Sequence, residues 1–280
     1  MNRRDGAPPG NPGGTWDSTL SSGEFAAVRS VGFDPVGQVL GTAVFNIGYT
    51  GLWACPGAWT AADGTERPTS RWAPSLSPMV STLYTARRLA LSRAVAECRE
   101  LGGDGIVGVD LQVGGFTAGM AEFTVLGTAV RARSRIRPRT PFTSHLRGQD
   151  FAKLLNTGWV PTGLAFGIAM ETRHDDWRTF GRGRWAAANQ EIEGYTQLIG
   201  RARQGARSQL ALDAAKHGGD GVVVDEVELK VRENECANGG SARDLVAEAV
   251  LVGTTIARFD RPRQSAGPAP LTIMRLEREH

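Results

Sequence analysis

The stretch "LGGDGIVGVDL" (residues 101–111) returns, with changes, as "HGGDGVVVDEVEL" (residues 217–229). Aligning the two GGDG motifs places residues 86–113 over residues 202–229, 116 positions later, with nine identities in 28 positions. Similarity within one chain at a fixed spacing indicates a repeated structural unit. The sequence therefore predicts a chain made of two similar halves.

Two further pairs of segments correspond at a different spacing, 126 positions. "GFDPVGQVLG" (32–41) matches "GWVPTGLAFG" (158–167), and "EFTVLGTAV" (122–130) matches "EAVLVGTTI" (248–256). The second half is thus ten residues shorter before its GGDG motif and ten residues longer after it. Length differences confined to two places are typical of loops between structural elements. We interpret the chain as a tandem duplication.

Each half begins with features of a short helix followed by a strand. Ser21 and Glu24 fit a capping box at the start of the first short helix, and Asp150 is expected to cap the second. Gly32 and Gly158 follow these helices, where a positive φ ends a helix at little cost. Strands are then expected at residues 36–46 and 162–172.

A long helix comes next in each half, because apolar residues recur at three- and four-residue steps. The GGDG motif follows this helix, so its glycines are expected to end the helix and lead into a buried strand. A phosphate-binding loop would instead need its glycines at the start of a helix. The segments ending in "GTAV" and "GTTI" are the predicted hairpin partners of these strands. The residues that recur at these steps are Val80, Leu83, Tyr84, Arg87, Leu91, Ala94, Val95, Cys98 and Leu101, and Ile192, Tyr195, Ile199, Ala202, Ala206, Leu210 and Ala214.

These elements predict an α+β protein with two homologous α-β-α-β-β domains, each a small sheet with one long helix packed on it. Such a unit leaves sheet edges and one sheet face uncovered, so it is expected to need neighbours. The predicted organisation is a disordered tail (1–21), a first domain (22–134), a basic linker (135–147), a second domain (148–260), and a linker with a docking tail (261–280).

Composition places few demands on function. The net charge of +3 does not call for a nucleic acid or a membrane surface as partner. No apolar run approaches the roughly 20 residues that span a bilayer, and the N-terminus lacks the apolar core of a secretory signal. The three cysteines, Cys55, Cys98 and Cys236, have no spacing typical of a disulfide framework or a zinc site. A soluble cytoplasmic protein is expected.

The helix with "ARRLALSRAVAECRELGGDGIVGVDL" and the strand "FTVLGTAV" resemble the YbjQ-like family, often labelled "putative heavy-metal-binding domain". The second half resembles it through "ARQGARSQLALDAAKHGGDGVVVDEV" and "VLVGTTI". The resemblance implies the fold described above and association into ring-like homo-oligomers, often pentamers. It implies no established reaction. A pentamer of this duplicated chain would carry ten domains.

The sequence offers weak support for a metal site. The best local cluster is Glu171, His174, Asp175 and Asp176, which we interpret as a solvated loop because adjacent aspartates usually face water. Zinc sites need about four nitrogen or sulfur ligands, and the histidines and cysteines of this sequence do not occur at the spacing of such a site. We predict no metal ligand, no cofactor and no catalytic residue.

Two charged positions recur in both halves: Arg87 with Arg203, and Glu122 with Glu248. Recurrent charges can belong to a binding site, but more often they form ion pairs that orient elements. We predict that these four residues make contacts between domains.

After "GTAV", arginine occupies every second position, at Arg131, Arg133, Arg135, Arg137 and Arg139. An extended chain would place them on one side, where they could bind a polyanion or an acidic partner. The alternative is a solubilising strand extension and linker. Specific RNA recognition is not expected, because no aromatic residues alternate with the arginines.

Tryptophans gather in the loop before each long helix. Trp53, Trp59 and Trp72 lie in the first half and Trp177 and Trp185 in the second, and we predict interface contacts for them. The C-terminal "LTIMRLEREH" is apolar enough to dock on a neighbour as a strand or short helix.

The sequence favours a non-enzymatic oligomeric assembly or scaffold module that forms a closed ring-like homo-oligomer. Its expected partner is itself, and an unidentified protein partner is left open. The alternative is a small-ligand or metal-binding protein with sites between domains. The sequence shows no set of residues that would support an enzymatic function.

Overall fold

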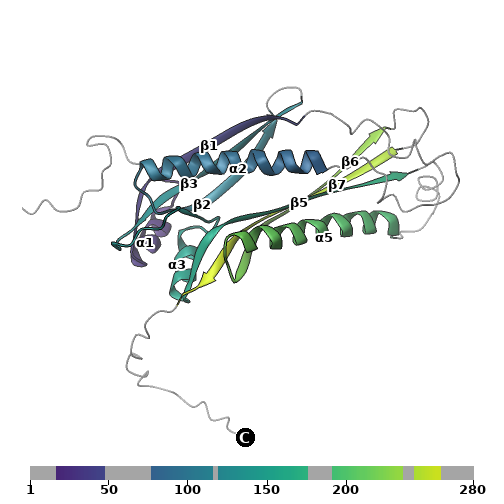
Figure 1. Cartoon of the computed structure of the whole chain (residues 1–280). Coiled ribbons are helices and arrows are strands. Elements are labelled where there is room, and N and C mark those ends of the chain that lie inside the picture. The colour runs from purple at the N-terminus through teal and green to yellow at the C-terminus, as the bar shows by residue number, and fades with distance from the viewer. Residues whose placement is uncertain (1–16, 48–76, 116–118, 176–190, 236–242, 260–280) are drawn as a thin grey trace, which may run out of the picture.

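The computed structural model describes residues 17–47, 77–115, 119–175, 191–235 and 243–259. Within them the fold is α+β, as predicted, with two sheets and helices packed on them (Figure 1). The elements are α1 (Ser22–Ser30), β1 (Phe33–Asn46), α2 (Ser77–Glu100), β2 (Gly105–Gly115), β3 (Met120–Ala132), β4 (Phe142–Thr143), α3 (Gly148–Asn156), β5 (Trp159–Asp175), α5 (Glu193–Lys216), β6 (Gly221–Glu235) and β7 (Arg243–Arg258).

The two sheets share one strand order. The first sheet runs β1-β3-β2-β4 and the second runs β5-β7-β6. In both, the last long strand of the half pairs antiparallel with the other two, as the predicted hairpins require. The two-residue β4 is the exception, because it lies between the halves in sequence and pairs parallel with β2.

The long helices lie very close to their sheets. A Cβ atom added to Gly41 of β1 would stand 2.0 Å from the carbonyl oxygen of Ala90, and one added to Gly167 of β5 would stand 2.1 Å from that of Ala206. Only glycine permits this approach, and alanines on the facing helix surfaces provide the matching space. α2 and α5 therefore pack directly on β1 and β5, on the inner faces of their sheets.

The helix ends follow the sequence with one exception. The capping box is present, since Ser21 N donates to Glu24 Oε2 at 2.8 Å. Positive φ angles occur at Gly32, Gly102, Gly158 and Gly218, as predicted. The prediction that Asp150 caps the second short helix is wrong.

That helix, α3, begins at Gly148 with Arg147 as its N-cap, and Asp150 lies in the first turn, 2.9 Å from Lys153 Nζ. The physical reason is the contact with α1: a Cβ atom at residue 148 would stand 2.5 Å from the Glu24 carbonyl oxygen. Glycine is required where the two short helices touch, and the helix starts at that glycine.

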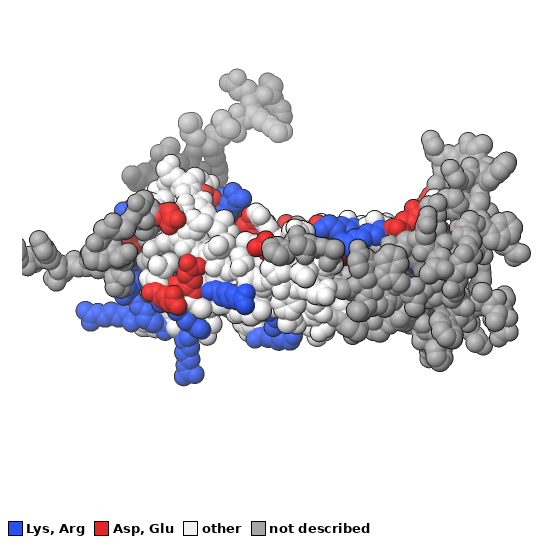
Figure 2. Space-filling model, turned by 90° about the horizontal axis from the view of Figure 1, so that it is seen from above, with Lys and Arg blue, Asp and Glu red and all other residues white. Residues whose placement is uncertain are grey.

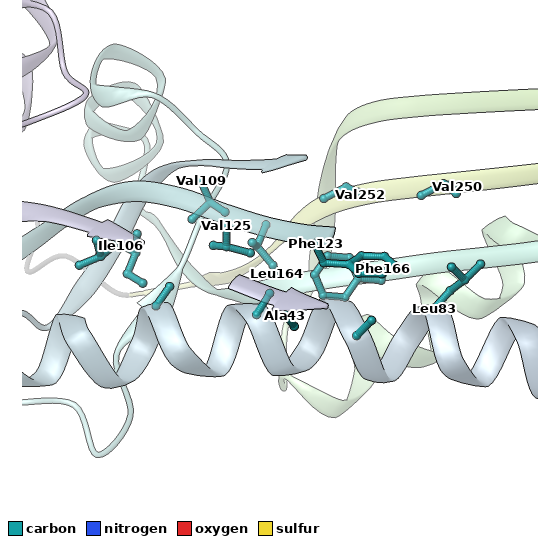
Figure 3. Close-up of a cluster of buried hydrophobic side chains, with 14 of the residues drawn as sticks. Ala43, Leu83, Ile106, Val109, Phe123, Val125, Leu164, Phe166, Val250 and Val252 are labelled. Carbon is teal, nitrogen blue, oxygen red and sulfur yellow. The ribbon is translucent and has the colours of Figure 1, made fainter. Parts of the chain in front are cut away.

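The largest hydrophobic cluster draws on both halves. Ala43, Phe123 and Val125 of the first sheet share it with Phe166 and Val252 of the second (Figure 3). Cys98 is fully buried in this cluster, as its place in the apolar series predicts, and burial raises the pKa of its thiol to about 12. The two sheets are thus joined by a continuous apolar core.

Candidate functional site

The most elaborate site in the described residues is the junction between the two halves, and it begins at the edge of β2. Residues 142–146 run alongside this edge. Ser144 N donates to Ile106 O at 2.9 Å, Val109 N to Ser144 O at 2.9 Å, and Gly108 N to Leu146 O at 3.0 Å. These bonds satisfy backbone groups that an edge strand would otherwise expose.

A buried threonine fixes this segment to the second sheet. Thr254 Oγ1 accepts from His145 N at 3.1 Å and lies 2.8 Å from His145 Nδ1 and 3.2 Å from Ser144 Oγ. Leu146 N in turn donates to Ser144 Oγ at 3.1 Å. Burial lowers the pKa of His145 below its ordinary value of 6.5, against the opposing influence of Asp225 and Asp150. The segment therefore joins the edge of the first sheet to β7 of the second.

The second sheet presents its outer face, the face turned away from α5, to the first half. Phe166, Ile168, Val250 and Val252 on that face are almost fully buried in the shared core. Tyr84 of α2 replaces a missing strand partner at the β5 edge: its hydroxyl donates to Phe166 O at 3.0 Å and accepts from Ile168 N at 2.9 Å. The junction thus combines apolar burial with backbone pairing.

A buried carboxylate adds polar contacts at the same place. The side chain of Asp213 on α5 is 3% exposed, and its Oδ2 accepts from Phe166 N at 3.0 Å. Its Oδ1 forms an ion pair with Arg88 of α2, which belongs to the other half. A buried charge needs such partners to offset its lost hydration. Asp213 therefore links β5, α5 and α2.

The short helices and three phenylalanines complete the junction. Gly23 and Gly148 lie where α1 and α3 touch, next to Gln149 and Glu24 respectively. Beneath them, the ring of Phe33 meets that of Phe151 edge-on at 5.2 Å, and Phe142 stacks on Phe151 at 5.7 Å. Each half contributes one short helix to this contact.

The four charged residues predicted to contact other domains lie in different surroundings. Arg87 is 3% exposed, stands over the Phe123 ring at 5.3 Å, and lines a cavity together with Val250 and Val252 of the second half.

Glu248 is buried beside Arg232 at 3.3 Å. Arg203 is exposed and Glu122 is half-buried. The structure does not bring the four together, and it places Arg87 against the other half.

The arginine run is not one extended row. The strand β3 ends at Ala132 and residues 133–135 form a bend. Arg133 pairs with Asp34 through two nitrogens, at 2.9 and 2.6 Å, and Arg137 pairs with Asp104. The predicted alternation therefore stops where the sheet stops.

Arg135 and Arg139 are exposed, and Arg131 is half-buried in β3. The face in Figure 2 shows Lys and Arg in isolated groups rather than as one continuous patch. Binding of a polyanion by these arginines stays a prediction.

Other predicted residues fall outside what the structure describes. Trp53, Trp59, Trp72, Trp177 and Trp185 all lie outside the described residues, as do Cys55, Cys236 and the C-terminal tail. Glu171 lies on β5 and is half-buried, while Asp176 also lies outside the described residues.

Among the residues that the structure describes, no group of three or more His, Cys, Asp or Glu could hold a metal ion. None of the described helices has the length and apolar character needed to cross a bilayer.

One cleft between the halves could admit a small molecule. It measures about 740 Å³ and lies between α2 and α5, where Tyr84, Arg88, Gln209 and Asp213 line it together with Met170. Three of its polar residues, Tyr84, Arg88 and Asp213, already bond across the junction.

The junction residues Ser144, His145 and Thr254 are not among the predicted site residues, although the sequence carries a signal for them. "STL" (18–20) and "SHL" (144–146) stand 126 positions apart, as do Thr128 and Thr254. Thr128 Oγ1 also meets its segment, accepting from Thr19 N at 3.2 Å. A serine and a leucine two residues apart, matched to a distant threonine, is the pattern to look for.

Comparison with known proteins adds two findings. A family model described as "Putative heavy-metal-binding" matches residues 74–133, which contain α2, β2 and β3. An encapsulin nanocompartment protein of Mycobacterium tuberculosis is 32% identical over 221 residues, which are 75% of this chain and 76% of that protein. This extent of similarity shows that the chain belongs to the family of the mycobacterial encapsulin nanocompartment protein.

Proposed function

We propose that this chain is a non-enzymatic assembly protein that associates with itself into a closed, ring-like homo-oligomer in the cytoplasm. Its work is to supply binding surfaces, and each chain contributes two domains derived from one ancestral unit. The relative is named as a protein of an encapsulin nanocompartment. We extend that association to this chain, as a component of, or a partner for, a protein shell.

The duplication is supported by contacts repeated at the two spacings seen in the sequence. Asp104 Oδ2 accepts from Ala132 N at 2.8 Å, and Asp220 Oδ2 accepts from Arg258 N at 2.8 Å. The acceptors are 116 positions apart and the donors 126, as the alignment requires. A repeated side-chain bond of this kind supports common ancestry more strongly than shared strand order, because many small folds share a strand order.

The observation that carries the assembly proposal is a set of exposed apolar side chains on strands. Leu40, Val44, Val113 and Met120 are exposed on the first sheet, and Val224, Val227, Leu229 and Val231 are exposed on β6. Large apolar patches and open apolar edges are uncommon on proteins that stay monomeric, because they promote pairing with other chains. Burial of these side chains against a neighbour would stabilise the oligomer by the hydrophobic effect.

The C-terminal segment extends the proposal to a second kind of partner. Its apolar residues are suited to dock on another protein, after a linker rich in proline, glycine and alanine; they are Leu271, Ile273, Met274 and Leu276. We propose that self-association uses the folded halves and that this tail remains available for the shell.

Native mass spectrometry of the purified chain tests the proposal. A single species holding several copies, with no bound small molecule, is the expected result. A monomer at micromolar concentration would contradict self-association. Retention of a defined extra mass would instead favour the alternative, a ligand site in the cleft between α2 and α5.

A further inference from the structure

The junction inside the chain uses two different surfaces. The first half contributes the outer side of α2 and the open edge of β2, which we call the helix surface. The second half contributes the outer face of β5 and β7 with residues 142–146, which we call the sheet surface. If the two halves are copies, each also carries the surface that the other uses. Those two counterpart surfaces are α5 with the β6 edge, and the outer face of β1 and β3 with residues 17–20.

The outer face of the first sheet is the uncovered counterpart of a buried one. Leu40 corresponds to Phe166, 126 positions later, and the two are 51% and 1% exposed. Glu122 is half-buried where its counterpart Glu248 is buried. The local backbone contact is nevertheless the same: Leu40 N donates to Glu97 Oε2 at 2.7 Å, as Phe166 N donates to Asp213 Oδ2 at 3.0 Å. The face is built alike in both sheets and covered in one.

The N-terminal segment is held as the junction segment is, but one side of it is open. Thr128 Oγ1 lies 2.8 Å from Thr19 Oγ1 and 3.3 Å from Ser18 Oγ, and Leu20 N donates to Ser18 Oγ at 3.0 Å. These bonds reproduce those of Thr254 with Ser144 and His145. Ser144 and His145 are buried against β2, whereas Ser18 is half-buried and Thr19 exposed. The segment is therefore positioned for a strand edge that the described part of the chain does not supply.

The β6 edge is such a strand edge. In the described residues β6 ends its sheet, whereas its counterpart β2 continues to β4. Val109 of β2 is buried and its backbone N–H donates to Ser144 O, whereas the corresponding Asp225 of β6 is exposed beside the exposed Val224. A strand with exposed valines and an open edge is suited to pair with an added segment.

The outer side of α5 is chemically matched to the first half, where Glu97 lies on α2. Arg203, the counterpart of the buried Arg87, is exposed. Gln204 stands where α2 has Arg88, and Glu97 stands where α5 has Asp213. Transferring the internal contact to two chains would place a glutamine amide opposite a carboxylate, which can accept its hydrogen bond. No like charges are brought together at that point.

We propose that the second half of one copy binds the first half of the next, head to tail, by the contacts that already join the halves within a chain. α5 then packs on the outer face of β1 and β3, and residues 17–20 of the second copy lie along the β6 edge. A head-to-tail contact produces a closed ring when its rotation divides the circle. The inference rests on the proposed self-association and adds its polarity and its residues.

A disulfide between chains tests this arrangement. β2 and β4 pair Ile106 with Thr143, so the counterparts Val222 and Asp17 should be neighbours across two chains. Paired strands lie roughly 4.8 Å apart, which is within the range for a disulfide. The test uses the full chain with Cys55→Ser and Cys236→Ser, keeping the buried Cys98, and adds Val222→Cys, Asp17→Cys or both.

Oxidation should convert the double variant into a ladder of covalent multimers that stops at the ring size, while each single variant stays uncross-linked. Covalent dimers from Val222→Cys alone would mean that two β6 edges pair with each other. That result, or an assembled double variant without cross-links, would overturn this inference and leave self-association standing. A wild-type chain that is monomeric in native mass spectrometry would overturn both.

A second measurement does not depend on a disulfide. Leu40→Glu should shift the oligomer to monomers with an unchanged circular dichroism spectrum, since Leu40 is exposed within the chain. Leu212→Glu is the matched control, because Leu212 is 61% exposed on α5 and its counterpart Ala96 lies outside the internal junction. Equal masses for Leu40→Glu and the wild type would contradict the proposed interface.

Discussion

The outer faces of the two sheets have corresponding residues and opposite surroundings. On the second sheet, Phe166 and Ile168 are buried against α2, and Tyr84 bonds to the β5 edge. On the first sheet, Leu40, which corresponds to Phe166, is 51% exposed, and Thr42, which corresponds to Ile168, is half-buried. The difference arises because, among the described residues, only one of the two faces has a partner. It teaches that an exposed apolar face can be identified as an interface when the same molecule shows how its counterpart is covered.

The largest expected effect is the difference in stability between truncating Phe166 on the covered face and truncating Leu40 on the exposed face. Phe166→Ala should lower the free energy of unfolding by about 3–5 kcal/mol, because it leaves a cavity in the shared core. Leu40→Ala should cost less than about 1 kcal/mol in dilute solution, where the chain is monomeric and the side chain is in water. Urea unfolding at two chain concentrations measures both.

The cost of Leu40→Ala should rise with chain concentration, while that of Phe166→Ala should not. Equal costs for the two substitutions in the dilute monomer would show that the faces do not differ as described.

The two buried threonines provide a smaller contrast. Thr254→Val removes the partner of Ser144 and His145, both buried, and should cost about 1–3 kcal/mol. Thr128→Val should cost about half as much or less in the monomer, because Ser18 and Thr19 can bond to water. Thermal unfolding of the two variants gives the comparison, and a larger loss at Thr128 would contradict it.

A gain of contact sharpens the comparison further. Gln204→Arg gives α5 the residue that α2 has at Arg88, and it should pair with Glu97 of the adjacent copy. Subunit dissociation should become slower by a few fold, equivalent to about 0.5–1 kcal/mol for one ion pair. The gain should vanish when Glu97→Gln is added. Subunit exchange followed by native mass spectrometry measures these rates, and no change in either variant would count against the contact.

The smallest expected effect is a pH dependence confined to the internal junction. Burial holds the pKa of His145 below 6.5, so the unfolded chain binds a proton before the folded chain does. Stability is therefore complete above about pH 6.5 and declines as the pH falls toward the lowered pKa of the folded state. His145→Gln should remove this contribution, because glutamine does not titrate. Matching pH profiles of unfolding for the variant and the wild type would contradict the assignment.

Much of the fold follows from local patterns in the sequence. The capping box at Ser21 and the glycines of the GGDG motifs act over a few residues, so sequence spacing alone reveals them. The junction does not follow in this way, because β4 is two residues long and has no periodicity to read. Local sequence does not predict the start of α3 for a related reason. Contact between Gly148 and α1 sets that start, and a side-chain capping signal does not.

The candidate site was less predictable than the fold. Recurrence predicts a domain contact for Arg87, but it does not distinguish Arg87 from Arg203, which is exposed. Burial differs between these two residues because the halves have different neighbours, and a single sequence does not record neighbours. The tryptophans and the C-terminal tail lie outside the described residues, so their predicted contacts stay predictions.

Amide hydrogen exchange tests most directly whether the internal junction is the template for contact between chains. Peptides covering 105–111 and 221–227 report on the covered β2 edge and on its β6 counterpart. In the assembled wild type both should be protected, and in the monomeric Leu40→Glu variant only the β2 peptide should remain so. Equal exchange of the β6 peptide in the assembled and monomeric proteins would contradict the account.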